Sequence, residues 1–231
     1  MKQENTYNQF ISENWIRKIE NCINLEELFD IWEEEAVKRG EKFLRDGSLS
    51  DAPLESHEIL FVCRESNDTE CKDSHNFWMK RVVQMKSAGK DFPGTTVKEN
   101  RAATKYYNCM HELINSPMKV GNEDKTTEIL KRSAYININK SGGGNKADFQ
   151  KLAEYALTYE PFIRKQIKII NPKKIIILGK LYGEPLIEFF EKIGQETQIE
   201  ILQYNRHPCV WSKNELKNFT CNIQKGASVL Q

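Results

Sequence analysis

The chain has 231 residues, of which 39% are hydrophobic and 29% charged, as expected for a globular protein with a buried core. No apolar run approaches the roughly eighteen residues that a membrane span needs, and the first ten residues lack the apolar stretch of a secretory signal. These features predict a cytoplasmic protein without a membrane partner. The net charge of +1 neither indicates nor excludes nucleic acid.

The six cysteines stand at positions 22, 63, 71, 109, 209 and 221, and none forms a C-x-x-C pair. Their wide, uneven spacing does not suggest a zinc or iron–sulfur site. In a reducing compartment we expect ordinary thiols, several of them buried. The sequence therefore predicts neither a metal nor a cofactor.

Residues 1–55 predict a helical extension of the main domain. Apolar residues recur at helical spacing, first through Trp15 and Ile19 and then through Phe29 and Trp32. Asn24 and the Asp46-Gly47 pair interrupt these patterns, and residues 48–53 have the composition of a linker. We therefore divide the chain into an N-terminal helical extension, 1–55, and an α/β domain, 56–231.

Four short apolar runs in the second part alternate with helical patterns. Strands are predicted at 59–63, 134–139, 174–178 and 199–204. Helices are predicted at 77–86, 104–114, 148–170 and 186–193, and from about residue 214. Asp148 is the expected N-cap of the long helix, Asn171-Pro172 its end, and Gly194 the end of the next helix. The alternation predicts an α/β fold: a three-layer α/β/α domain with a four-stranded parallel core sheet.

Polar residues follow three of the predicted strands. The segments are 64–68 (Arg-Glu-Ser-Asn-Asp), Asn137 and Asn139 with the glycine loop 141–145, and 205–208 (Asn-Arg-His-Pro). The carboxyl ends of parallel strands meet at one edge of a sheet, where ligands bind in such folds. The sequence therefore predicts an active site at this edge.

In order and spacing these segments resemble the signatures of the uracil-DNA glycosylase superfamily. Segment 62–67 resembles the water-activating motif, and 134–137 the strand whose terminal Asn reads the base. Segment 207–212 is similar to the His-Pro-Ser-Pro-Leu-Ser loop, and 171–179 to the strand that precedes it. The resemblance covers residues 58–212. The first motif departs from the family pattern, which usually has Gly at Cys63, Asp, Asn or Ala at Glu65, and Pro at Ser66.

The resemblance implies a role for each candidate residue. Glu65, with Asp68 as second choice, is the carboxylate that stabilises an oxocarbenium-like state and orients water. His207 donates a hydrogen bond to the departing base, and Asn137 pairs with the edge of a flipped base. The remaining base-pocket candidates are Ser66, Asn67 and the stacking ring of Phe77. The DNA-contact candidates are the wedge Trp211 and the phosphate-facing residues Lys140, Ser141, Gly142, Gly143 and Ser212.

The implied activity is that of a monofunctional DNA glycosylase that uses water as nucleophile, flips its target base and needs no cofactor. DNA is the expected partner and base-excision repair the expected setting. Because Ser66 and Asn67 are small or polar, a modified pyrimidine larger than uracil would fit. Some members of the family act in bacterial defence against phages with modified DNA, so a hypermodified phage cytosine is one expected substrate.

Other interpretations of the same residues remain open. Glu65 could pair with Arg64, Asn137 could end its strand, and His207 could brace a turn; Phe77 and Trp211 could belong to the core. A non-catalytic nucleic-acid-binding module on the same fold is the main functional alternative. A nucleotide- or sugar-phosphate-binding enzyme would use the glycine loop as an anion cradle, but no G-x-G-x-x-G or P-loop motif follows any predicted strand.

Overall fold

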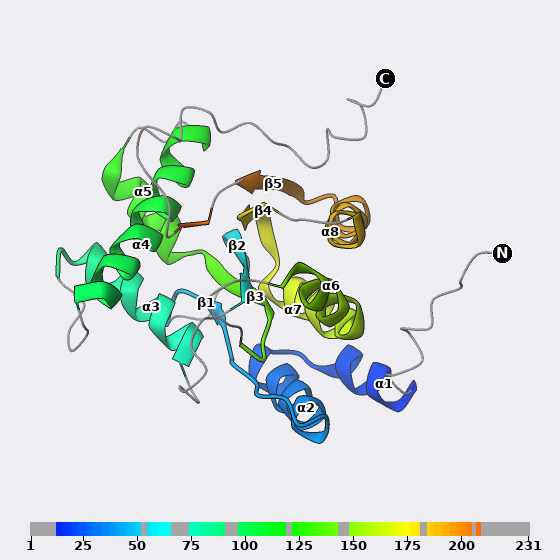
Figure 1. Cartoon of the computed structure of the whole chain (residues 1–231). Helices are drawn as coiled ribbons and strands as arrows, with labels where there is room; N and C mark the ends of the chain where they lie inside the picture. The colour runs from blue at the N-terminus through cyan, green and yellow to red at the C-terminus, as the bar shows by residue number, and fades with distance from the viewer. Residues whose placement is uncertain are drawn as a thin grey trace.

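A computed structural model of the chain describes residues 13–51, 55–65, 74–90, 97–118, 122–142, 148–180, 184–204 and 207–208 (Figure 1). The strands in these ranges are β1 (Gly47–Ser48), β2 (His57–Glu65), β3 (Ala134–Asn139), β4 (Pro172–Leu178) and β5 (Glu200–Tyr204). The helices are α1 (Glu13–Asn21), α2 (Leu25–Lys38), α3 (Ser74–Ser87), α4 (Val97–Met118), α5 (Glu123–Lys131), α6 (Phe149–Thr158), α7 (Glu160–Ile170) and α8 (Glu184–Thr197).

The predicted α/β class is confirmed, but the prediction of a four-stranded parallel sheet is wrong. The strands form one mixed five-stranded sheet in the order β1-β3-β2-β4-β5. β3, β2, β4 and β5 pair in parallel, whereas the two-residue strand β1 pairs antiparallel with β3 through Gly47↔Tyr135 and Ser48↔Ala134. The segment expected to be a linker therefore begins with a strand at the edge of the sheet.

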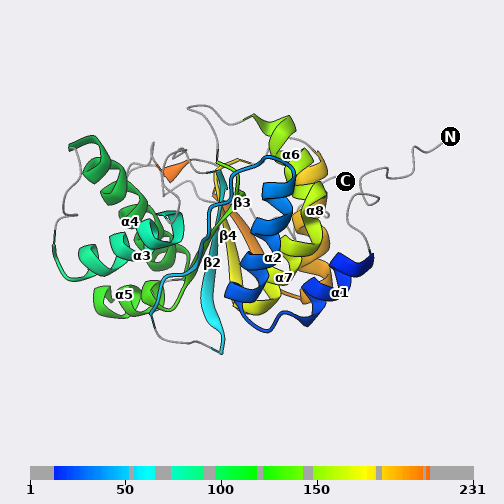
Figure 2. The same cartoon turned by 90° about the horizontal axis from the view of Figure 1, so that it is seen from below.

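Helices cover both faces of the sheet (Figure 2). The side chains of β2 alternate between the two faces, as the pleat of a strand requires. Ile59, Phe61 and Cys63 join the core beneath α3, α4 and α5, whereas Leu60 and Val62 join the core on the opposite face, shared with α2, α6, α7 and α8. Both faces are apolar because both are covered, which explains the continuous apolar run in the sequence.

The first two helices pack on the main body of the protein rather than standing apart from it. The fully buried indole of Trp32 in α2 stacks on Phe162 of α7, with ring centroids 5.1 Å apart, and also contacts Phe43 at 5.4 Å. The guanidinium of Arg45 pairs with acidic side chains of α2. Residues 13–51 thus contribute two helices and an edge strand to the same core.

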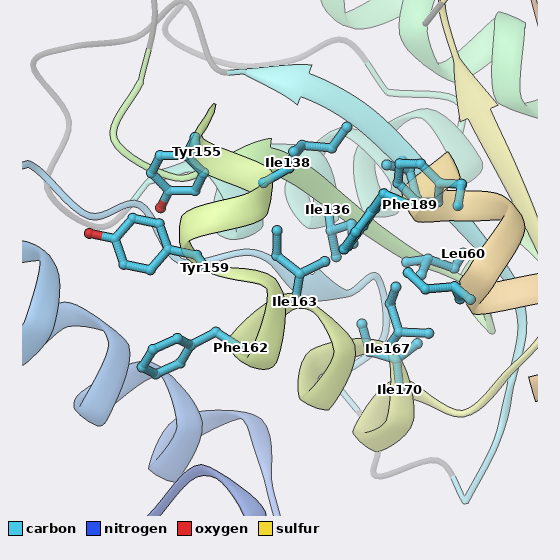
Figure 3. Packing of buried hydrophobic residues seen from close by; sticks show 14 of the residues in the cluster. Leu60, Ile136, Ile138, Tyr155, Tyr159, Phe162, Ile163, Ile167, Ile170 and Phe189 are labelled. Atoms are coloured by element: carbon cyan, nitrogen blue, oxygen red, sulfur yellow. The ribbon is translucent and has the colours of Figure 1, made fainter. Parts of the chain in front are cut away.

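Helix α7 supplies much of the larger core (Figure 3). Its buried residues Phe162, Ile163, Ile167 and Ile170 recur at the three- and four-residue spacing of one helix face. As Figure 3 shows, Phe162 points toward the N-terminal helices, whereas Ile163 and Ile167 point toward Ile136 and Leu60 of the sheet. The amphipathic pattern seen in the sequence is therefore the surface that joins helix to sheet.

Several element boundaries differ from the predictions. The helix predicted at 148–170 is two helices, α6 and α7, which meet at Tyr159 with a proline in the first turn of α7. α8 runs past Gly194 to Thr197, α4 begins at Val97, and α5 was not predicted. Asp148 caps α6 by accepting hydrogen bonds from two backbone amides, and Asn171 ends α7, both as predicted. Asn171 adopts the left-handed conformation. The helix predicted from residue 214 lies outside the described residues.

Cys22, Cys63 and Cys109 are buried thiols, as predicted; the other three cysteines lie outside the described residues. Across the helices that the structure describes, none is both long enough and apolar enough to cross a membrane.

Candidate functional site at the carboxyl edge of the sheet

The strand order defines where a ligand crevice is expected. β2 is the first of the parallel strands, and the chain crosses from it to β3 on one side and later to β4 on the other. The crevice in such a sheet lies at this switch point, beyond the carboxyl ends of the strands. Arg64 and Glu65 at the end of β2 and Gly179 after β4 occupy this place.

A group of five polar or aromatic side chains meets on the α4 side of this edge, and we call it the Cys63 cluster: Cys63, Tyr106, Tyr135, Asn137 and His207. Cys63 pairs with Asn137 in the β2–β3 register. Its Sγ lies 3.9 Å from Nε2 of His207 and 4.0 Å from the Tyr106 hydroxyl. The Tyr106 hydroxyl and His207 Nε2 are hydrogen-bonded at 3.1 Å. The Tyr135 hydroxyl lies 3.5 Å from Oδ1 of Asn137, a long hydrogen bond.

Burial keeps this cluster neutral. Burial, together with the smaller effect of the positive charge of Arg64, lowers the pKa of His207 to about 4. Burial likewise raises the pKa of the Cys63 thiol and that of the Tyr135 hydroxyl. A thiolate–imidazolium nucleophile of the cysteine-protease kind is therefore disfavoured here. A neutral imidazole can instead accept one hydrogen bond and donate another.

Arg64 places a cation at the switch point. Its guanidinium lies 5.3 Å above the ring of Phe149, the first residue of α6. A Cβ on Gly179 would lie 3.7 Å from Arg64 Nε, and Gly179 has a positive φ of 115°. The side chain thus spans the gap between β4 and α6. Its charge, which disfavours a protonated His207, favours an anion at the same edge.

A second polar group lies on the opposite side of β3, and we call it the Asp46 cluster: Asp46, Lys140, Gln166 and the backbone amide of Asn137. Both Asp46 oxygens accept from Lys140 Nζ at 2.6 Å. Oδ1 also accepts from Gln166 Nε2 at 2.8 Å, and Oδ2 from the Asn137 backbone N–H at 2.7 Å. The Asp46 and Lys140 side chains are both 0% exposed. Lys140 Nζ lies 5.4 Å from the Trp32 ring.

The structure brings some of the predicted site residues together. Asn137 and His207 both lie beside Cys63. Glu65 is part of β2 rather than of the following loop, and its Cα pairs with Asn139. Asn139 organises the next turn, because its Oδ1 accepts from the backbone and hydroxyl of Ser141 and its Nδ2 donates to the carbonyl of Gly142.

The prediction that Lys140 contacts a DNA phosphate is wrong. Its sequence position beside the glycine loop suggested a phosphate contact, but its ammonium group is buried and held by both oxygens of Asp46. An Asp 94 residues away in the sequence neutralises it, so it does not face a phosphate in this structure.

The other predicted site residues cannot be positioned in the same way. Phe77 belongs to α3, but its side chain lies outside the described part of the structure. Six further predictions fall wholly outside the described residues: Ser66, Asn67, Asp68, Gly143, Trp211 and Ser212. Among the side chains that the structure describes, no group of three His, Cys, Asp or Glu residues could hold a metal ion.

A groove of about 680 Å³ lies elsewhere, between α1, α7 and α8. Ile16 and Ile19 line it on one side, and Lys165, Lys168 and Lys192 contribute basic side chains. No predicted site residue lines it. The Cys63 cluster remains the candidate site because it, rather than the groove, lies at the carboxyl ends of the strands.

Three residues near the site were missed by sequence reasoning. Tyr106 lies on the apolar face of α4, where a tyrosine is indistinguishable from a core residue in the sequence. Asp46 was interpreted only as part of a turn. Arg64 was placed in the polar segment after the first strand, but the one role considered for it was pairing with Glu65.

Comparison of the chain with protein-family models, curated proteins and solved structures finds no match.

Proposed function

We propose that this chain is a monofunctional DNA glycosylase that hydrolyses the N-glycosidic bond of a flipped uracil or modified pyrimidine. One observation carries the proposal: Asn137 and a neutral His207 meet beside Cys63 at the carboxyl edge of the sheet. These are the two residues to which the motif resemblance assigns base reading and leaving-group stabilisation. They come from segments 70 residues apart in the sequence.

The chemistry requires groups that stabilise separating charges. When the bond between the sugar C1′ and the base nitrogen breaks, its electron pair leaves with the base and the sugar becomes oxocarbenium-like. A neutral imidazole N–H stabilises the anionic base without first giving up a proton, as an oxyanion-hole donor does. The charge of Arg64 acts in the same direction. Water then attacks C1′, and Glu65 is the proposed carboxylate that orients it and takes its proton.

Asn137 is the proposed reader of the base, since its amide can donate to and accept from one edge of a pyrimidine. Its Oδ1 makes a long 3.5 Å contact with the Tyr135 hydroxyl, and a neutral hydrogen bond of this kind contributes little net energy, so it can be exchanged for one with a ligand. Phe77 as stacking ring, Trp211 as wedge, and Ser141, Gly142, Gly143 and Ser212 as phosphate contacts remain predictions from the sequence.

The proposed substrate range extends beyond uracil. A pocket for uracil is compact, with a bulky side chain that rejects the methyl group of thymine, whereas Ser66 and Asn67 are small or polar. A glycosylase for hypermodified phage cytosine, acting in antiviral defence, fits this composition. A competition between DNA that contains uracil and DNA that contains hydroxymethyl- or glucosyl-cytosine tests the extension. Release of uracil alone would exclude it.

The test of the activity is base release, measured by mass spectrometry on uracil-containing, unmodified and phage-modified DNAs. We expect H207A to lower the rate about 10²–10³-fold, as the loss of an oxyanion-hole donor does, and E65Q to lower it as well. His57 provides a matched control because it is also a histidine but lies buried at the amino end of β2, away from the carboxyl edge of the sheet. H57Q should leave the rate per folded molecule unchanged. No release by the wild-type protein on any DNA would contradict the proposal.

A non-catalytic nucleic-acid-binding module is the second candidate, and one observation favours it. Cys63 is 1% exposed and Asn137 2% exposed, so the described part of the cluster is closed. A binding module would bind DNA with strong salt dependence and release no base. Its affinity would be the same for H207A as for the wild type.

A further inference from the structure

We infer that Asp46 is a positioning residue for Asn137, held in place by Lys140, so that the N-terminal segment of the chain sets the geometry of base recognition. The inference rests on the proposed function in that it takes Asn137 as the base reader. It goes further by giving a buried ion pair, on the other side of β3 from the Cys63 cluster, a part in specificity.

The first step is the interruption of a strand. The segment 44–49 runs antiparallel beside β3, and its two ends make backbone hydrogen bonds: Leu49 N–H to the Ser133 carbonyl, and Leu44 N–H to the Lys140 carbonyl, both at 2.9 Å. Between them β1 pairs only as far as Gly47↔Tyr135. The Asn137 N–H lies beyond this last pair and donates to the Asp46 carboxylate at 2.7 Å. The Asp46 side chain thus supplies the acceptor that a backbone carbonyl would supply if β1 continued beside β3.

The second step is the rigidity of that carboxylate. Besides the bond from Asn137 it accepts three hydrogen bonds, two from Lys140 Nζ and one from Gln166 of α7. All three side chains are fully buried. A buried carboxylate with this many short hydrogen bonds has one available orientation, because turning it would break a charge-assisted bond in a dry environment.

The third step is the difference between the Asp46–Lys140 ion pair and an apolar pair of similar volume. Buried ion pairs can often be replaced by hydrophobic residues of similar volume without loss of stability. Such a replacement would fill the space between α2, α7 and β3, but it would offer no acceptor to the Asn137 N–H. The ion pair therefore contributes an acceptor at a fixed place, and that acceptor sets the backbone of the residue whose side chain lies in the Cys63 cluster. Displacements of about 1 Å at a reacting centre cost large factors in rate.

Two double variants separate positioning from stability. D46N/K140M removes both charges but keeps a side-chain oxygen that can accept from Asn137. D46L/K140M removes both charges and the acceptor, with nearly the same volume. The proteins are compared at a temperature where unfolding curves show both fully folded, together with the wild type.

We expect kcat of D46N/K140M for base release to stay within about 3-fold of the wild type, a difference smaller than the loss of one typical hydrogen bond. We expect kcat of D46L/K140M to be about 10-fold lower or more, with little change in KM, because binding of the DNA backbone does not depend on Asn137. Its ratio of rates on two different bases should also move toward one. Equal kcat and equal base preference in the two double variants would overturn the inference and leave Asp46 a purely structural residue.

A second readout does not depend on glycosylase activity. Amide hydrogen exchange of the Asn137 N–H, followed by NMR, should be at least about 10-fold faster in D46L/K140M than in D46N/K140M, since only the first lacks an acceptor. The side-chain amide signal of Asn137 should shift in the same variant. If the wild type releases no base, the proposed function fails, and these two measurements still decide the positioning role. Unchanged exchange and an unchanged signal would overturn it.

Discussion

The two polar clusters flank the same strand end but are built in opposite ways. The Asp46 cluster contains a full charge pair, and its hydrogen bonds lie between 2.6 and 2.8 Å. The Cys63 cluster is neutral, and the four contacts described above among its side chains lie between 3.1 and 4.0 Å. Asn137 belongs to both, since its backbone N–H binds Asp46 and its side chain faces Tyr135. The strand end thus has one rigid side and one adaptable side.

The physical reason for the difference is the cost of leaving a group without a partner. A buried charge must stay paired, because the desolvation penalty is not recovered otherwise. A neutral hydroxyl, thiol or imidazole loses much less, so it can exchange a protein partner for a ligand. A recognition site needs both properties, since the reading group must be held while its contacts with the ligand form and break.

The largest expected effect comes from removing one charge of the Asp46 cluster. D46A leaves the Lys140 ammonium buried without its counter-charge, and we expect a loss of about 3–5 kcal/mol in the free energy of unfolding. D46L/K140M removes both charges and should lose far less. Urea unfolding followed by circular dichroism measures both. If D46A and the double variant were equally stable, the ion pair would not be the rigid element that its short bonds indicate.

The second expected effect is a pH dependence of the free energy of unfolding, which comes from His207 in the Cys63 cluster. The pKa of His207 is about 4 in the folded protein and roughly 6.5 when unfolded, so the unfolded chain binds more protons between these values. The stability from a neutral His207 is complete above pH 6.5 and is lost as the pH falls toward 4. At roughly 1.4 kcal/mol per pKa unit, the loss is about 3 kcal/mol.

Unfolding curves of the wild type and H207Q between pH 4 and 8 measure this loss. H207Q should lack the His207 part of the pH dependence, so the two proteins should differ most in slope between pH 4 and 6.5. His57, whose pKa is also lowered by burial, is present in both proteins and cancels in the difference. Parallel curves would mean that His207 has the same pKa in the folded protein as in the unfolded chain, which would contradict a His207 that burial keeps neutral.

The comparison also explains what the sequence could predict. The strand at 174–178 was found because its isoleucines run continuously, as in a strand covered on both faces. In the strand at 134–139, Ile136 and Ile138 alternate with Asn137 and Asn139. β1 has two residues, Gly47 and Ser48, and carries no periodic pattern. Helix α5 is polar over most of its length, with only two apolar residues near its end, so periodicity could not reveal it.

The two clusters also differ in how many of their residues could be predicted from the sequence. Asn137 and His207 were predicted because polar residues at strand ends are unusual and matched a motif order. Asp46 and Lys140 find each other across 94 residues, and nothing local distinguishes this lysine from one that faces solvent. Tyr106 contacts His207 across 101 residues. Pairings of this range depend on the packing of α4 and of the N-terminal segment against the sheet.

The smallest expected effect comes from removing one hydroxyl from the Cys63 cluster. Y106F removes the hydroxyl that lies 3.1 Å from His207 Nε2 but keeps the ring, whose centroid is 5.6 Å from that of His207 in an edge-to-face arrangement. Because the lost bond joins two neutral groups, we expect the free energy of unfolding to fall by only about 1 kcal/mol and Tm by roughly 2–4 °C. Y107F is the matched control: it removes the same atom from the next residue of α4, whose ring stacks on His111 instead. A loss for Y106F as large as that of D46A would mean that the Cys63 cluster is held as rigidly as the Asp46 cluster. A cluster held in that way could not open to admit a base without a comparable cost, and the binding role of this edge would then be untenable.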